Sequence, residues 1–186
     1  MLQFPSIPSW DSLHPLIVHF PIVLLLLSPL FILISMILAP PKGRPYMTVA
    51  LIILVLGTGS LFLATETGEA GAMLAQRGGG MDAILAAHQS LASETEIVFT
   101  VLAVILLGMV LLPRFLRRRE TRLATTFLPL AFLVLYSVGV LFLINTADAG
   151  ARLVHEFGVH AVMPAQNTVP DFAPADAKSA LGARVK

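Results

Sequence analysis

The sequence predicts an all-α integral membrane protein, built as a bundle of four transmembrane helices. Two observations lead to this class. Hydrophobic residues make up 56% of the 186 residues and charged residues only 12%, with a mean hydropathy of +0.86. The chain also contains four long apolar runs, and about 20 such residues are needed to cross a bilayer. Because lipid-exposed backbone must satisfy its own hydrogen bonds, each run is expected to be a helix.

The four predicted spans have no Lys, Arg, Asp or Glu inside them; they are Leu16–Ala39, Met47–Thr65, Ile97–Leu112 and Phe127–Asn145. Pro15 suits the first position of the first helix. Pro21 should kink or loosen that helix, because proline cannot donate to the carbonyl of Ile17. The third helix is expected to begin near Ala83 and the fourth to continue to Gly158, a typical helix stop. Helices two to four should therefore extend beyond the lipid into a small extracytoplasmic cap.

A short repeat suggests a duplicated helical hairpin. Residues 69–75 read EAGAMLA and residues 148–154 read DAGARLV, once after the second span and once after the fourth. Parallel repeats about an axis along the membrane normal are a known way to build membrane folds. Chance agreement between common small residues is the alternative. The bundle is predicted to occupy residues 1–160, and the tail 161–186, rich in Ala and Pro, to be extended or disordered.

Basic residues predict the orientation of the chain. Lys and Arg gather in the loop after the first span and in the loop after the third, and cytoplasmic loops collect these residues. The basic residues are Lys42, Arg44, Arg114, Arg117, Arg118, Arg119 and Arg122. Ten of the eleven carboxylates lie on the opposite side. We therefore expect a multi-pass protein of a bacterial inner membrane with both termini in the periplasm.

All five histidines fall on the predicted outer side, and they are the main functional signal. They are His14, His19, His88, His155 and His160. Histidine is the commonest metal ligand, although any one of them could simply bond to backbone or lipid headgroups. His19 is the strongest candidate because it lies inside the first span, where a polar group needs a partner. His14 and His19 are five residues apart and would not share one face of an ideal helix.

The opening LHPLIVHFPIVLLL resembles that of a bacterial four-helix membrane family of unassigned function, marked by His-Pro-x-x-Val-His-Phe-Pro. Its six defined positions match residues 14, 15 and 18–21. The resemblance implies a histidine near the start of the third span, which His88 matches. It also implies a closing motif with tyrosine and then histidine, where this chain has His155 and Phe157 instead. The family implies an architecture and a histidine-marked outer site, without an established chemistry.

Three functions fit these observations. The first is a membrane electron-transfer subunit that binds b-type haem through two axial imidazoles. His19 and His88 are its best axial candidates, with His14 and His155 as a second pair or as supporting groups. The second is a site for a Zn, Cu or Fe ion, with three imidazoles and Glu66 or Glu69. The third is a non-catalytic scaffold subunit of a larger membrane complex.

Other classes find little support. The chain has no cysteine, which excludes disulfides, thiolate-bound zinc, cysteine-held iron–sulfur clusters and covalent c-type haem. No nucleophile–base pair, phosphate loop or metalloprotease motif is present, so we expect no catalytic activity of its own. The net charge of +1 gives no reason to expect that the protein binds nucleic acid. Membrane lipid and other membrane or periplasmic redox subunits are the expected partners.

Overall fold

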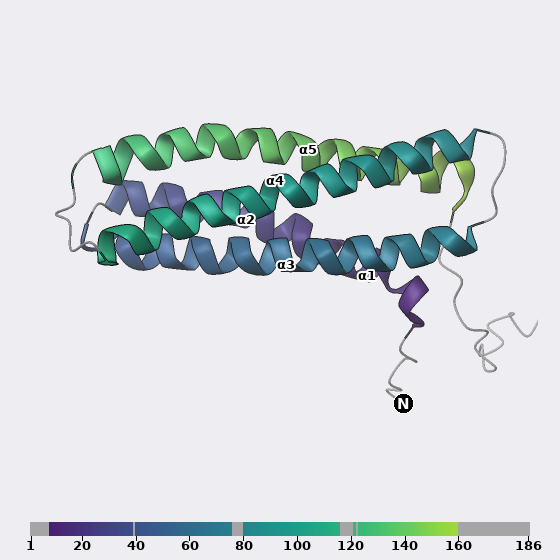
Figure 1. Ribbon diagram of the computed structural model, residues 1–186, viewed down its shortest axis with the longest axis horizontal. Helices are drawn as coiled ribbons and strands as arrows, with labels where there is room; N and C mark the ends of the chain where they lie inside the picture. Colours follow the sequence, from purple (N-terminus) through teal and green to yellow (C-terminus); the bar gives the residue numbers. More distant parts are fainter. Residues whose placement is uncertain (1–7, 39, 76–79, 116–120, 122, 160–186) are drawn as a thin grey trace, which may run out of the picture.

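The computed structural model describes residues 8–38, 40–75, 80–115, 121 and 123–159. Four long helices run side by side along the longest axis of the molecule (Figure 1). The elements in chain order are η1 (Trp10–Ser12), α1 (His14–Ile17), α2 (His19–Leu38), α3 (Arg44–Leu74), α4 (Met81–Phe115), η2 (Leu123–Phe127) and α5 (Leu128–Phe157). With α1 and α2 taken together, four helical segments are long and apolar enough to cross a membrane. The described residues form no strand, and the predicted four-helix membrane class is confirmed.

The helices form a ring in which each packs on two neighbours. The contacts of α2 with α3 and of α4 with α5 are the most extensive, those of α3 with α4 come next, and those of α2 with α5 are the sparsest. Helix α2 therefore lies diagonally opposite α4, and α3 lies diagonally opposite α5. Because α2 and α4 both start at the same end, the two hairpins are related by a rotation about the long axis of the bundle (Figure 1).

Proline and glycine set the helix boundaries. The first span is interrupted at Val18, between α1 and α2, close to Pro21 as expected from the missing proline N–H. Helix α5 ends at Phe157, and Gly158 follows in the left-handed conformation with φ +67°. Helices α3, α4 and α5 contain 31, 35 and 30 residues, roughly three to four turns more than a bilayer requires. The predicted tail, 161–186, lies outside the described residues.

The two hairpins share many of their buried positions. Positions in α1 and α2 match positions 74 residues later in α4, and positions in α3 match positions 82 residues later in α5. Matched positions are buried together; such pairs are Leu25 with Phe99, Ser28 with Leu102, Ile32 with Leu106, Leu54 with Tyr136, and Gly57 with Gly139. Gly57 packs against Leu24 and Leu25, and Gly139 packs against their counterparts Val98 and Phe99. The two hairpins therefore have similar patterns of buried positions, as the hairpin duplication suggested by the sequence predicts.

The register of this duplication differs from the one suggested by the motif. The motif alignment places Gly71 opposite Gly150, whereas the structure pairs Gly68 with Gly150. The reason is contact: Gly68 and Gly150 each face a histidine ring, while a Cβ at Gly71 would lie 2.9 Å from the backbone oxygen of Asp11. The alignment of the two seven-residue motifs therefore differs by three residues from the pairing of positions in the structure.

Tyr136 joins the two hairpins at the centre of the bundle. Its ring is 1% exposed and lies edge-on to Phe99, with 5.5 Å between the ring centroids. Its hydroxyl donates a hydrogen bond of 2.6 Å to the carbonyl oxygen of Leu25. Pro29, inside α2, lacks the N–H that would normally bond that carbonyl. The tyrosine therefore satisfies an acceptor that would otherwise be unpaired within a membrane span.

Candidate functional site

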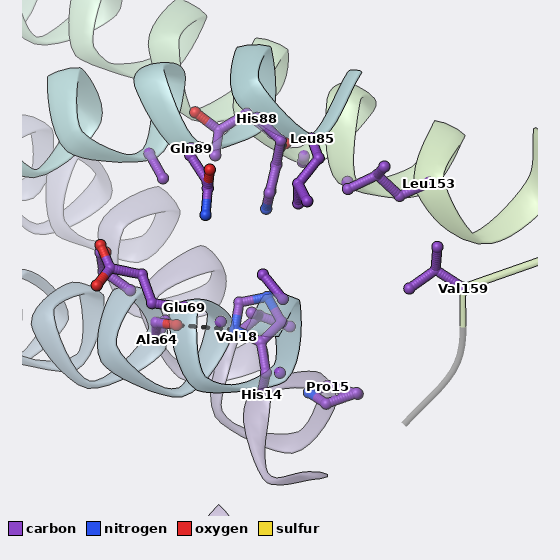
Figure 2. A pocket seen from close by; sticks show the side chains of 18 of the residues that line it. His14, Pro15, Val18, Ala64, Glu69, Leu85, His88, Gln89, Leu153 and Val159 are labelled. Carbon is purple, nitrogen blue, oxygen red and sulfur yellow. Dashed lines mark hydrogen bonds between the residues drawn. The ribbon is translucent and has the colours of Figure 1, made fainter. Parts of the chain in front are cut away.

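A cavity of about 480 Å³ lies at the end of the bundle where α1 begins and α5 ends (Figure 2). Residues of η1, α1, α2, α3, α4 and α5 line it. Its walls are mainly apolar, and several lining residues are small, namely Ala64, Gly68, Ala72, Ala92, Ala147 and Gly150. Its size falls within the range of roughly 300–1,000 Å³ that is typical of small-molecule and cofactor sites.

His14 reaches the cavity from α1. Its Nδ1 lies 2.7 Å from the carbonyl oxygen of Ala64 on α3. The Cε1 edge of the ring rests on Gly68, where a Cβ would lie only 2.9 Å away. Pro15, in the first turn of α1, favours the helical start that carries the ring, because its φ is already fixed near the helical value. Glycine at position 68 is what lets this ring approach the backbone of α3.

His88 is held in the same way from α4. Its Nδ1 lies 2.9 Å from the carbonyl oxygen of Thr146 on α5, and a Cβ at Gly150 would lie 3.0 Å from its Cε1. In both halves the accepting carbonyl belongs to the residue four positions before the glycine. Each hairpin thus contributes one histidine, one carbonyl and one glycine in equivalent positions.

The two rings meet near the axis that relates the hairpins. Their centroids are 6.4 Å apart and their planes are inclined by 85°. Figure 2 shows the side chains of His14 and His88 pointing toward one another from opposite walls of the cavity. This arrangement follows from the fold, because α1 and α4 lie on opposite corners of the helix ring.

The hydrogen bonds to Ala64 and Thr146 fix which ring nitrogen is free. A carbonyl oxygen only accepts, so Nδ1 of each ring must carry the hydrogen. In a neutral imidazole Nε2 then holds the lone pair. Among the described residues neither Nε2 has a hydrogen-bond partner. Histidines that bind metals are commonly oriented by such a bond from the other ring nitrogen.

The remaining histidine candidates lie elsewhere. His19 and His155 are on exposed helix faces and do not line the cavity. His160 lies outside the described residues. The structure therefore brings together two of the four predicted ligands, His14 and His88, and leaves the other two apart from them. His14 and His19 are five residues apart, and their side chains lie on different faces of the first span, as this spacing predicts.

The acidic residues proposed as additional metal ligands are not gathered around the histidines. Glu66 and Glu69 are both exposed, and only Glu69 lines the cavity. Within the described part of the chain, no group of three or more His, Asp and Glu side chains could hold a metal ion. The donor set at the centre of the cavity is therefore a pair of imidazoles.

Sequence reasoning missed the residues that support the histidines. These are the carbonyls of Ala64 and Thr146, together with Gly68. Backbone acceptors carry no side-chain signal, and Gly68 precedes the motif that was used to align the hairpins. A comparison of the two halves at a spacing of 74 residues pairs His14 with His88. A spacing of 82 residues in the following helices, which pairs Gly68 with Gly150, would have pointed to the glycines.

The fold and the cavity define a class: a four-span membrane protein with two facing histidines in a cavity at one end of its bundle. Residues 11–163 match the family described as "Predicted membrane protein (DUF2231)", and the chain belongs to this family. The resemblance to a membrane family of unassigned function is thereby confirmed. No curated protein and no solved structure matches the chain significantly.

Proposed function

We propose that this protein is a membrane electron-transfer subunit that binds b-type haem between His14 and His88. One observation carries the proposal. Two imidazoles from diagonally opposite helices face one another across an apolar cavity, and each is oriented by a hydrogen bond from Nδ1 to a backbone carbonyl.

The spacing of the rings suits a pair of axial ligands. Metal–imidazole bonds are about 2.0–2.1 Å long and an imidazole nitrogen lies about 1.1 Å from its ring centre, so ligands on opposite sides of one metal have centroids about 6.3 Å apart. The observed separation of 6.4 Å agrees with this value. Ligands at a tetrahedral angle around one ion would have centroids about 5 Å apart.

The number of donors also favours haem over a bare ion. A zinc site normally needs three or four protein ligands, and the described residues gather only two imidazoles here. A haem needs only two axial ligands, because the porphyrin supplies the other four nitrogens. Other small residues line the cavity near the rings, namely Ala72, Ala92 and Ala147, and they would limit steric conflict with a bound group.

Haem iron bound here would accept and release one electron. The protein's part is to hold the two rings in fixed orientations, to surround the site with apolar side chains, and to leave each Nε2 free for coordination. From the positions of Lys42 and Arg44 at the far end of the bundle, we further propose that the site lies on the periplasmic side of a bacterial inner membrane. The surplus turns of α3, α4 and α5 would then form the cap around it.

The test is an absorbance spectrum of the detergent-purified protein, oxidised and then reduced, before and after haem is added. The wild-type chain should show a Soret band and a sharp α band on reduction. His14→Ala and His88→Ala should each weaken haem binding by at least the 10–100-fold loss typical of disturbed metal ligation.

His19→Ala and His155→Ala are the matched controls, because both histidines are exposed and lie outside the cavity. They should keep the wild-type spectrum and affinity. A wild-type protein that neither contains haem nor binds added haem would refute the proposal. Equal losses in all four variants would refute the assignment of His14 and His88.

A further inference from the structure

The planes of the two facing histidine rings are nearly perpendicular, and backbone groups fix this angle. The planes of His14 and His88 are inclined to one another by 85°. In each ring Nδ1 lies off the line that runs from Nε2 through the ring centre, so a fixed acceptor for its hydrogen restricts rotation of the plane about that line. The acceptors are the carbonyl oxygens of Ala64 on α3 and Thr146 on α5. Each ring plane is therefore set by the backbone of one neighbouring helix.

The residue that orients His88 is held from α4 at two points. His88 Nδ1 lies 2.9 Å from the backbone oxygen of Thr146, and Thr95 Oγ1 lies 2.8 Å from the Thr146 hydroxyl oxygen. His88 and Thr95 are seven residues apart, about two helical turns, so both lie on the face of α4 that meets α5. Thr95 is fully buried, and both threonines line the cavity. The helix that carries His88 thus also holds the residue whose carbonyl orients it.

The two threonine hydroxyls form a hydrogen bond between the helices. Thr95 Oγ1 also lies 2.7 Å from the carbonyl oxygen of Leu91, and Thr146 Oγ1 lies 2.9 Å from that of Phe142. Two hydroxyls supply only two hydrogens for these three contacts. If both hydrogens went to the carbonyls, two oxygen atoms would face one another at 2.8 Å with no hydrogen between them. One hydroxyl therefore donates to the other, and this bond joins α4 to α5 within the bundle.

The first hairpin has no equivalent bond. The positions that match Thr95 and Thr146 are Pro21 and Ala64, and neither side chain has a hydroxyl group. The Ala64 carbonyl instead lies 3.1 Å from Oγ1 of Thr67, which belongs to the same helix. A bond within α3 does not fix one helix against another. Of the two orienting carbonyls, that of Thr146 is therefore the one braced by a hydroxyl pair.

We propose that Thr95 is a positioning residue for His88, and that the two rings keep their perpendicular planes as axial ligands of haem. This inference rests on the proposed function. Perpendicular axial imidazoles leave two d orbitals of ferric iron nearly equal in energy, whereas parallel imidazoles separate them. In electron paramagnetic resonance (EPR), the first arrangement gives one unusually large g value and the second gives three well-separated g values. The angle between the rings is therefore measurable in the haem-loaded protein.

The test combines EPR of the oxidised, haem-loaded protein in detergent with haem titration by absorbance. The wild-type protein should show the large g value of perpendicular imidazoles. Thr95→Val keeps the shape of the side chain and removes the hydroxyl, so the spectrum should shift toward three separated g values. Haem affinity should fall about tenfold, as for groups that support metal ligands. Thr95→Ser keeps the hydroxyl and should retain the wild-type spectrum and affinity.

Thr58→Val is the matched control. Thr58 is 5% exposed, its hydroxyl donates to the carbonyl of Leu54 within α3 at 2.8 Å, and it does not line the cavity. Its replacement should change neither the spectrum nor the affinity. Thr146→Ala removes the interhelical bond from the other side and introduces the residue found at the matched position of the first hairpin. It should act like Thr95→Val, and it keeps the inference open to refutation if that variant fails to fold.

The outcomes separate the inference from the function on which it rests. A wild-type spectrum with three separated g values would overturn the perpendicular arrangement. Wild-type spectra in Thr95→Val and Thr146→Ala, or an equal shift in Thr58→Val, would overturn the role of Thr95. The haem site would remain in each of these cases. A wild-type protein that takes up no haem would instead remove the proposed function, and the inference with it.

Discussion

The two glycines beneath the histidines allow the most direct test of how the site is built. A Cβ added at Gly68 would lie 2.9 Å from both Cε1 and Nδ1 of His14, and one added at Gly150 would lie 3.0 Å from Cε1 of His88. Carbon atoms in contact prefer a separation of about 3.5–4.0 Å. Gly68→Ala and Gly150→Ala should therefore push each ring away by roughly 0.5 Å or more.

The size of the effect follows from the hydrogen bonds. The 2.7 Å bond from His14 to Ala64 would lengthen toward the limit of about 3.2 Å for a good N–H···O bond. Losing such a bond at a buried site costs about 1–3 kcal/mol, while replacing a helical glycine with alanine returns about 0.5–1 kcal/mol. We expect a net loss of about 1–2 kcal/mol in the free energy of unfolding. Haem affinity should fall about 10–100-fold, as in sites whose orienting bonds are disturbed.

The assays are denaturant unfolding in detergent micelles and haem titration by absorbance. Gly59→Ala and Gly108→Ala are the matched controls, because a Cβ at either position meets no atom within 4 Å. They should be as stable as the wild type or more stable by up to about 1 kcal/mol. If Gly68→Ala and Gly150→Ala unfold and bind haem like these controls, the glycines do not position the rings and the argument is wrong.

Two further substitutions test the frame of the bundle. Pro29 already deprives the Leu25 carbonyl of its helical donor, so Tyr136→Phe would leave this carbonyl unpaired within the membrane span. The free energy of unfolding, measured with denaturant, should fall by about 1–3 kcal/mol. An unchanged unfolding midpoint would contradict this expectation. Arg152→Gln removes an ion pair with Glu156 that is exposed on α5, and such surface pairs contribute little. Neither the unfolding midpoint nor the haem spectrum should change, and a shift in either would show that this end of α5 is coupled to the site.

Much of the fold could be predicted because single residues decide it. The apolar runs specify four spans, the break near Pro21 follows from the missing N–H, and Gly158 stops α5 in the left-handed conformation. These are local effects, because the residue responsible lies within one helical turn of the feature that it produces. The position of His88 on a long extension of the third helix is predictable for the same reason, since nothing interrupts α4 between Met81 and that residue.

The choice between His14 and His19 could not be predicted in this way. Position inside an apolar run favours His19, yet that ring is exposed and His14 faces the cavity. The deciding factor is the carbonyl of Ala64 and the glycine at position 68, which α3 presents 50 or more residues later. Long-range pairing of this kind leaves no periodic signal in the first span itself.

The repeated arrangement of the hairpins explains why the two histidines face one another, but not why each ring lies so close to the backbone of the neighbouring helix. Deeper in the bundle the axis is filled by large side chains such as Phe99 and Tyr136, both almost fully buried. At the level of the histidines both halves instead place glycine, which disfavours a helix by about 0.5–1 kcal/mol, and a histidine ring occupies the space beside each glycine. Neighbouring matched positions have diverged, as Pro21 and Thr95 show, while the histidine, carbonyl and glycine recur in both halves. The two glycines are therefore explained by the close approach of the histidine rings, which a Cβ at either position would prevent.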